Sequence, residues 1–133
     1  MKVAEVMRTK VKTVAPEATV GEAVVSLADG HVSALPVVDD VGALLGVLST
    51  SDILTAVAEA DGTDERGKVF GETLVRDLMT PRVITIEPDA DVEEAAKQML
   101  YLEVHRLFVT DGGKLVGVIS QTDVVGAVAT AKL

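Results

Sequence analysis

The chain has 133 residues, which is enough for one domain or for two small units that share a core. Its 48% hydrophobic residues include no apolar run near the roughly 20 residues of a membrane span, and no signal-like leader opens it. We therefore expect a cytoplasmic protein without a membrane partner. The absence of cysteine excludes disulfides, zinc–thiolate sites and thiol catalysis. The net charge of −9, from 12 basic and 21 acidic side chains, opposes binding to nucleic acid, which we do not expect as a partner.

The first half of the sequence recurs in the second half. After a one-residue gap in a turn, GVLSTSD at 46–52 returns as GVISQTD at 117–123, 71 positions later. Before that gap the offset is 72, and the matched pairs are Val3/Val75, Met7/Met79, Pro16/Pro88, Val20/Val92, Ala23/Ala95, Leu35/Leu107, Val37/Val109 and Asp39/Asp111. A repeat that covers nearly the whole chain indicates two copies of one structural unit.

Each copy predicts a short strand, a helix, a hairpin and a second helix. In the first copy, Thr19 and Glu22 form a capping box before an amphipathic helix that ends near Gly30. ALPVVD and LLGVLS then predict a β-hairpin, and TSDILTAVAEA predicts a helix. In the second copy, Asp91 and Glu94 occupy the cap positions, RLFVTD and LVGVIS predict the hairpin, and QTDVVGAV predicts the last helix.

These patterns divide the chain into three parts. Residues 1–60 form the first copy and residues 75–133 the second. Residues 61–74 (DGTDERGKVFGETL) are charged, contain glycine and lack a sustained apolar period, so we expect a mobile connector there.

The repeated motifs resemble those of the cystathionine β-synthase (CBS) domain. They are VAEVM and VRDLM, TVAP and TIEP, ALPVVD and RLFVTD, and GVLSTSD and GVISQTD. Two tandem copies look like a CBS pair, or Bateman module, and the resemblance spans residues 3–127. It implies an α/β fold whose copies pack around a pseudo-twofold axis, with clefts that hold AMP, ADP, ATP or S-adenosylmethionine in many members. It also implies a stand-alone regulatory or energy-sensing protein, a homodimer and a separate regulated protein partner.

The repeated serine and aspartate are the main candidate site residues. Ser49 and Asp52, like Ser120 and Asp123, stand where a strand passes into a helix. A carboxylate there can accept hydrogen bonds from ribose hydroxyls, and the serine and helix N-terminus suit a phosphate. The same Ser-x-x-Asp pattern is also an ordinary helix cap, so the residues alone leave both interpretations open.

The resemblance implies further ligand-binding candidates. Arg106 begins the second hairpin, at a position where some members of the family carry a basic residue that binds ligand phosphates. The first copy has Ala34 at this position, so we expect the two sites to differ in affinity. His105 beside it is a weaker candidate, for which a surface or packing role is the alternative. The predicted set is completed by Thr13, Thr85, Thr50 and Gln121, while Arg8, Lys10, Lys12 and Arg82 lie near segments that border the cleft in the family.

No motif for catalysis is present, and we expect neither an enzyme nor a metal site nor an obligatory cofactor. The leading hypothesis is a nucleotide sensor that binds an adenosine ligand between its repeats and signals to another protein. The alternative is a dimerisation or interaction module whose clefts stay empty. We treat Gly46 and Gly117, within hairpin strands, as structural.

Overall fold

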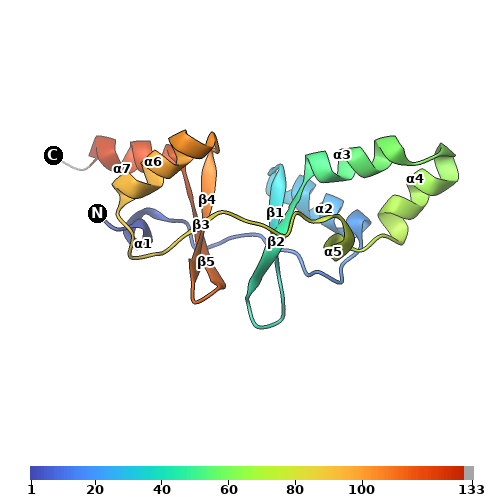
Figure 1. Cartoon of the computed structure of the whole chain (residues 1–133), viewed down its shortest axis with the longest axis horizontal. Coiled ribbons are helices and arrows are strands. Elements are labelled where there is room, and N and C mark those ends of the chain that lie inside the picture. Colours follow the sequence, from blue (N-terminus) through green and yellow to red (C-terminus); the bar gives the residue numbers. More distant parts are fainter. Residues whose placement is uncertain (131–133) are drawn as a thin grey trace. The chain divides into compact units, whose positions relative to one another are not determined.

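The computed structural model describes residues 1–130 of the chain. Both predicted hairpins and all four long predicted helices are present, which confirms a mixed helix and strand fold built from two repeats (Figure 1). The elements are α1 (Val3–Val6), α2 (Val20–Gly30), β1 (Ala34–Val38), β2 (Leu44–Ser49), α3 (Thr50–Glu59), α4 (Gly62–Gly71), α5 (Val75–Leu78), β3 (Thr85–Ile86), α6 (Val92–Leu102), β4 (Arg106–Asp111), β5 (Lys114–Ser120) and α7 (Gln121–Thr130).

The compact units are offset from the sequence repeats. One unit is Lys12–Val83, and the other joins Met1–Val11 to the chain from Ile84 onward. Each unit therefore contains the body of one repeat and the opening segment of the other. The short helix that begins each repeat, α1 or α5, packs on the hairpin and helices of the opposite repeat.

In the unit Lys12–Val83, the antiparallel pair β1–β2 packs against α2 and α3. Apolar residues at helical spacing on α2 and at alternate positions on the strands meet there, as the two periodicities require. Val75 of α5 is fully buried in the same core. The buried cluster consists of Val14, Val20, Ala23, Leu27, Leu35, Val37, Leu48, Ile53 and Val75.

The other unit is built in the same way around the three-stranded sheet β3–β4–β5. β3 pairs with β4 in parallel and β4 pairs with β5 in antiparallel orientation, and α6 and α7 cover one face. Val3 of α1 is fully buried among these elements. The buried cluster consists of Val3, Ile86, Val92, Ala95, Met99, Leu107, Val109, Ile119 and Val124.

Glycine lets each opening segment approach its hairpin. The backbone of Arg8 exchanges hydrogen bonds of 2.8 and 2.9 Å with Val118 of β5. A Cβ atom on the neighbouring Gly117 would lie 2.7 Å from the Met7 sulfur and 2.8 Å from the Arg8 carbonyl oxygen. Only glycine fits this approach, which supports the structural role expected of it. In the other unit, Gly46 leaves the same space for Met79 and Thr80.

The short strand predicted at the start of each repeat forms in the second repeat but not in the first. The second repeat has the two-residue strand β3, but within the described residues the first repeat has only an isolated parallel bridge between Val14 and Val37. Thr85 pairs with Phe108 in the second repeat, and the first repeat has Pro36 at the position of that phenylalanine. Proline has no N–H to donate, so the pairing stops one residue short.

The segment expected to be a mobile connector is largely helical. α4 occupies Gly62–Gly71, and its end packs on α2 so closely that a Cβ on Gly21 would lie 2.8 Å from the Phe70 carbonyl oxygen. Val69 also packs against the core of its unit. Tertiary contact at one end of α4 stabilises a helix whose own sequence lacks an apolar stripe.

The predicted helix caps are realised differently in the two repeats. Thr19 caps α2 and its side-chain oxygen accepts the amide of Glu22 at 3.2 Å. Asp91 stands at the N-cap of α6 but makes no cap hydrogen bond, because its carboxylate pairs with the Lys2 ammonium at 3.0 Å instead. Throughout residues 1–130, none of the helices has both the length and the apolar character needed to cross a bilayer.

Candidate functional site

The Ser49 site lies where β2 passes into α3. The Ser49 side-chain oxygen accepts the Asp52 amide at 3.1 Å, and Asp52 Oδ2 accepts the Ser49 amide at 2.9 Å. This reciprocal pair is a complete capping box. The capping interpretation of the motif is therefore correct, and it leaves Asp52 Oδ1 outside the cap.

The Ser120 site has the same geometry at the junction of β5 and α7. The Asp123 amide donates to the Ser120 hydroxyl oxygen at 3.1 Å, and the Ser120 amide donates to Asp123 Oδ2 at 3.0 Å. In both repeats the cap fixes the carboxylate beside the first turn of a ten-residue helix, where backbone N–H groups and the helix dipole favour negative charge.

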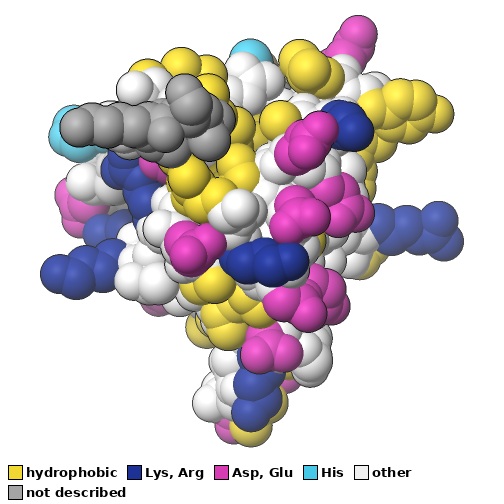
Figure 2. Space-filling model, turned by 90° about the vertical axis from the view of Figure 1, so that its left-hand side faces the viewer, with side chains coloured by type: hydrophobic (Ala, Val, Ile, Leu, Met, Phe, Trp, Pro, Cys, Tyr) yellow, Lys and Arg dark blue, Asp and Glu magenta, His cyan; other side chains and the backbone are white. Residues whose placement is uncertain are grey.

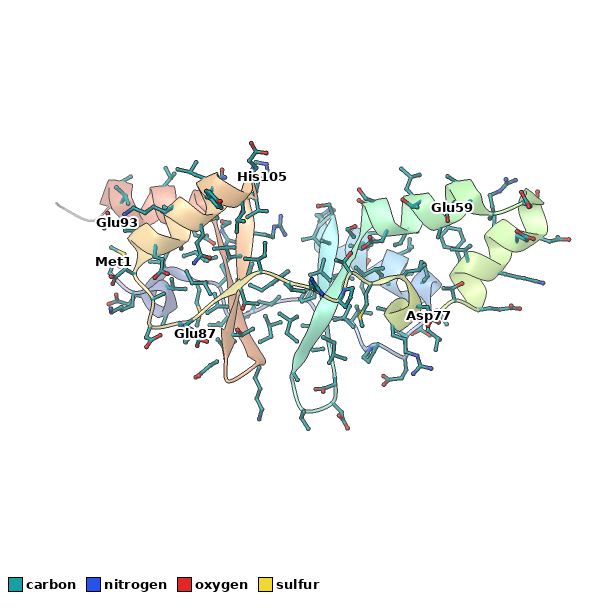
Figure 3. The ribbon with its side chains drawn as sticks, in the orientation of Figure 1. Met1, Glu59, Asp77, Glu87, Glu93 and His105 are labelled. Atoms are coloured by element: carbon teal, nitrogen blue, oxygen red, sulfur yellow. The ribbon has the colours of Figure 1, made fainter. Side chains whose placement is uncertain are left out.

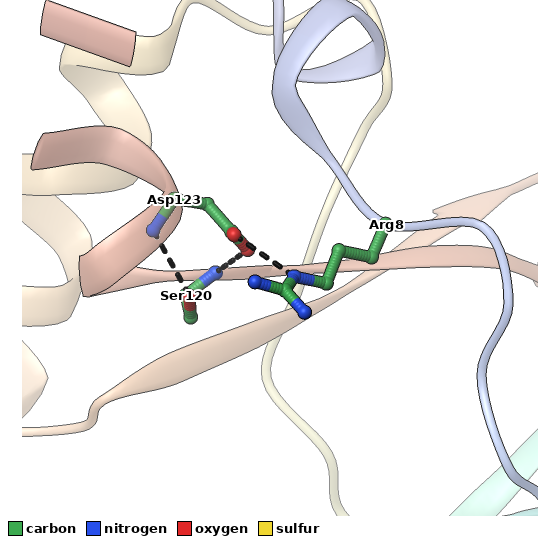
Figure 4. A network of polar contacts seen from close by, with 3 residues as sticks. All are labelled: Arg8, Ser120 and Asp123. Carbon is green, nitrogen blue, oxygen red and sulfur yellow. Dashed lines mark hydrogen bonds and ion pairs between the residues drawn. The ribbon is translucent and has the colours of Figure 1, made fainter. Parts of the chain in front are cut away.

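The outer carboxylate oxygen of each site meets the opening segment of the other repeat. Arg8 Nε donates to Asp123 Oδ1 at 3.0 Å (Figure 4), and the Thr80 hydroxyl donates to Asp52 Oδ1 at a long 3.4 Å. Arg8 and Thr80 are equivalent positions of the repeat, so the sites differ in charge at one place. From the sequence, Arg8 was predicted only as one of several basic residues near the cleft, and Thr80 was not predicted at all. The available signal was their position, because each directly follows the methionine that recurs in both repeats.

The Asp123 carboxyl is the more enclosed partner of its ion pair. Its side chain is 9% exposed, against 70% for Arg8. Burial raises the pKa of the Asp123 carboxyl, but hydrogen bonds from Ser120 and Arg8, together with the charge of Arg8, outweigh burial and leave the pKa lowered. A lowered folded-state pKa stabilises the fold above the unfolded pKa of about 3.9, and this contribution is lost as the pH falls through the folded pKa.

We expect Arg8→Thr to reduce the free energy of unfolding at pH 7 by about 0.5–1 kcal/mol, the range of a largely exposed ion pair. The reduction should shrink as the pH falls below about 3.9 and through the lowered pKa of folded Asp123, because protonation of the carboxylate removes the charge that Arg8 pairs with. Urea unfolding at pH 7 and at about pH 2 measures both values. Lys97→Thr, which breaks the exposed Lys97–Glu93 pair on α6, is the control and should change little. An equal loss at both pH values would contradict the assigned pair.

The structure places Arg106 and His105 at the edge of the Ser120 site. Arg106 is exposed and its Cα lies directly across the β4–β5 pair from Ser120. The corresponding partner of Ser49 is Ala34. His105 is exposed just before β4, at the top of Figure 3, and its carbonyl oxygen accepts the Gln121 amide.

Among the described residues, the remaining candidates make no hydrogen bond to the Asp52 or Asp123 carboxylate. Thr50 is the exposed first residue of α3, and Gln121 is the half-buried first residue of α7, with its side-chain amide bonded to the Val104 carbonyl at 3.1 Å. Thr13 is exposed beside the Val14 bridge, in the unit of Ser49. Thr85 is half-buried on β3, in the unit of Ser120. Ligand contact by these four residues stays a prediction, as it does for the serines, the aspartates, Arg106 and His105.

An apolar groove of about 640 Å³ lies between α2, α3 and α4. Thr50 contributes to its wall, but Ser49 and Asp52 do not. Among the described residues, no group of three His, Cys, Asp or Glu side chains is arranged to hold a metal ion. The chemistry available at the two sites is thus hydrogen-bond acceptance by a fixed carboxylate, joined by a guanidinium in one of them.

The fold and the repeated site define a known class of domain. The family model described as CBS domain matches residues 3–59 and again residues 75–130. The chain belongs to the CBS domain family and carries two copies in tandem. The expected resemblance is confirmed.

Three relatives illustrate the likeness. The chain is 32% identical to the CBS domain-containing protein YhcV of Bacillus subtilis, over 91% of this chain and 81% of that one. It is 31% identical to the uncharacterised protein MK0525 of Methanopyrus kandleri over 92% of this chain, but spans only 60% of that protein's length. The crystal structure of CBSX2 of Arabidopsis thaliana in complex with AMP has a TM-score of 0.81 and 32% identity, covering 99% of this chain and 98% of that one.

Proposed function

We propose that this CBS pair binds an adenosine-containing ligand at the Ser49 and Ser120 sites and passes the bound state to a separate protein. The observation that carries the proposal is the fixed carboxylate. Asp52 and Asp123 are each held by a serine amide beside a helix N-terminus, with Oδ1 turned away from the cap. Such an oxygen is suited to accept ribose hydroxyls, and the adjoining N–H groups are suited to a phosphate.

The relatives support an adenosine ligand without deciding which one. CBSX2, similar over nearly its whole crystallised chain, has been crystallised with AMP. AMP, ADP, ATP and S-adenosylmethionine all carry the ribose that the carboxylates would recognise. Binding would regulate by favouring one of two conformations or assemblies for which the ligand has different affinity, and a regulated partner would read the change.

Substituting one aspartate tests the ribose assignment. We expect Asp52→Asn or Asp123→Asn to weaken binding at its own site by about tenfold or more, because charge-assisted hydrogen bonds contribute about 1.5–3 kcal/mol. Asparagine keeps an oxygen for the serine amide, so the fold should change little. Calorimetric titration of each variant with AMP and S-adenosylmethionine measures the effect.

The control is Asp111→Asn, which removes the same charge from the exposed end of β4, at the other end of the hairpin from Ser120. It should bind like the unchanged protein. Unaltered binding in both site variants would overturn the ribose assignment. A thermal-shift screen gives the first result, since ligand at about 100 times its dissociation constant stabilises by about 2.7 kcal/mol, or several degrees.

A second candidate function is dimerisation through the helices. Large apolar side chains are exposed on α3, α6 and α7, including Leu54 at 68%, Leu100 at 74% and Tyr101 at 88%. Gathered exposed side chains of this size are typical of interaction surfaces. A concentration-dependent change in mass by sedimentation, together with silence across the ligand screen, would favour this module over the sensor.

Nucleic acid remains the least supported partner. On the face shown in Figure 2, Asp and Glu side chains lie among the Lys and Arg side chains. Together with the net charge of −9, this distribution gives a polyphosphate backbone little attraction. A gel shift at low salt should show no complex.

A further inference from the structure

Two arginines flank Ser120 on one face of its sheet. Arg106 is the direct cross-strand partner of Ser120. Arg8 is bridged to Val118, two residues before Ser120 on β5. Directly opposed residues share a sheet face, as do residues two apart on one strand. Arg8, Ser120 and Arg106 therefore share the face opposite the one that packs on α6 and α7.

The Ser49 site has neither positive charge at the equivalent positions. Thr80 is bridged to Val47 where Arg8 is bridged to Val118, and Ala34 lies opposite Ser49 where Arg106 lies opposite Ser120. Lys12, which replaces Ile84 of the second repeat, lies in the same unit as Ser49. The stem of Lys12 lies 3.4 Å from where a Cβ on Gly30 would be, at the end of α2. At the two positions that flank the serine, the Ser120 site thus has two guanidinium groups and the Ser49 site has a hydroxyl and a methyl group.

Arg8 is held in a position that leaves it able to bind more. Its Nε donates to Asp123 Oδ1, and within residues 1–130 no other group receives a hydrogen bond from its guanidinium. The two terminal nitrogens therefore remain free to bind, on a side chain that is 70% exposed. In Figure 4 the dashed line to Asp123 starts from Nε of Arg8. A planar guanidinium that is already positioned by a carboxylate is suited to bind a phosphate, because its side chain loses little further conformational entropy on binding.

Resting on the proposed function, we propose that the two sites select ligands of different charge. The Ser120 site takes phosphate-bearing adenosine ligands, with Arg8 and Arg106 as its phosphate-binding residues. The Ser49 site takes adenosine derivatives with little regard to phosphate. The helix N-terminus is common to both sites and does not discriminate between them, so the difference arises from the arginine positions.

Two single-site variants separate the preferences. With the Ser49 site weakened by Asp52→Asn, AMP should bind at least about tenfold more tightly than adenosine, equivalent to about 1.4 kcal/mol. With the Ser120 site weakened by Asp123→Asn, the two ligands should differ by less than about threefold. Calorimetric titration gives both affinities in each variant, at one fixed salt concentration because phosphate binding is screened.

Exchanging the flanking residues tests the cause. Arg8→Thr with Arg106→Ala, added to Asp52→Asn, should remove the preference for AMP while adenosine still binds. The chain already has Thr80 and Ala34 at the equivalent positions of the Ser49 site, so the fold should accept both changes. Lys114→Thr is the control, because it removes a positive charge from the end of the same hairpin remote from Ser120 and should leave the preference intact.

The outcomes are distinct. An equal preference for AMP at both sites, or a preference that survives loss of both arginines, overturns charge selection and leaves the proposed function standing. Binding of neither AMP nor adenosine to the unchanged protein overturns the proposed function and this inference with it. Loss of the preference only when the arginines are replaced supports the inference.

Discussion

Gly117→Ala is expected to destabilise the protein by about 2–4 kcal/mol. The added Cβ would lie 2.7 Å from the Met7 sulfur and 2.8 Å from the Arg8 carbonyl oxygen, closer than real contacts allow. The opening segment must then move away, which strains the packing and breaks the two hydrogen bonds between Arg8 and Val118. Chemical denaturation measures the loss. Gly46→Ala should act alike, since its Cβ would lie 2.6 Å from the Thr80 carbonyl oxygen.

Gly126→Ala provides the matched control. Gly126 is within α7, and among residues 1–130 no atom outside the adjoining helix backbone and chain neighbours lies within 4 Å of the position of its Cβ. Alanine is the better helix former there, so this variant should gain up to about 1 kcal/mol. A loss below about 0.5 kcal/mol for both Gly117→Ala and Gly46→Ala would show that the opening segments are not held as described.

Gly117→Ala should also weaken AMP binding at the Ser120 site, because the added Cβ displaces the segment that carries Arg8.

Two fragments of nearly equal length should differ greatly in stability. Residues 12–83 form one compact unit with its buried Val75, whereas residues 1–74, which follow the repeat, lack that valine and the Val47–Thr80 hydrogen bonds. Loss of the buried valine and of the Val47–Thr80 hydrogen bonds costs about 2–4 kcal/mol, which is a large share of the stability of so small a fragment. We expect fragment 12–83 to unfold cooperatively in urea. Fragment 1–74 should show no cooperative transition, or one at a much lower urea concentration.

A full-length variant guards against both fragments failing to fold. Val75→Ala should lower the free energy of unfolding by about 2–3 kcal/mol, through lost burial and a residual cavity. Val41→Ala, at an exposed position in the β1–β2 turn, should stay within about 0.5 kcal/mol of the unchanged protein. Greater stability of 1–74 than of 12–83 would instead support boundaries set by the repeat.

The opening segment of each repeat packs on the other repeat, which gives a physical reason for two copies of the unit in one chain. The Asp123 carboxylate receives its arginine from the opening of the first repeat, and Asp52 receives the Thr80 hydroxyl from the opening of the second. One copy alone would lack the last residue of its own site. Duplication followed by change at residues 8 and 80, and at 34 and 106, is sufficient to make the two sites chemically unequal.

The hairpins, the long helices and the Ser-x-x-Asp caps were predictable because each depends on residues close in sequence. Alternating apolar residues, turn glycines and capping side chains act over a few positions, and each of these patterns occurs in both repeats. The prediction from local sequence fails at Asp91. This residue occupies the cap position, but a lysine 89 residues away takes its carboxylate.

The sequence by itself determined the repeated unit, the family and the serine and aspartate of each site, since these follow from local propensity and from motif spacing. Only the tertiary structure decided that α4 is a helix, that Pro36 limits the first predicted strand to a single bridge at Val14, and which opening segment reaches which hairpin. Those features depend on contacts between residues far apart in the chain, such as Arg8 with Asp123. Their partners are selected by packing, and no local pattern in the sequence encodes them.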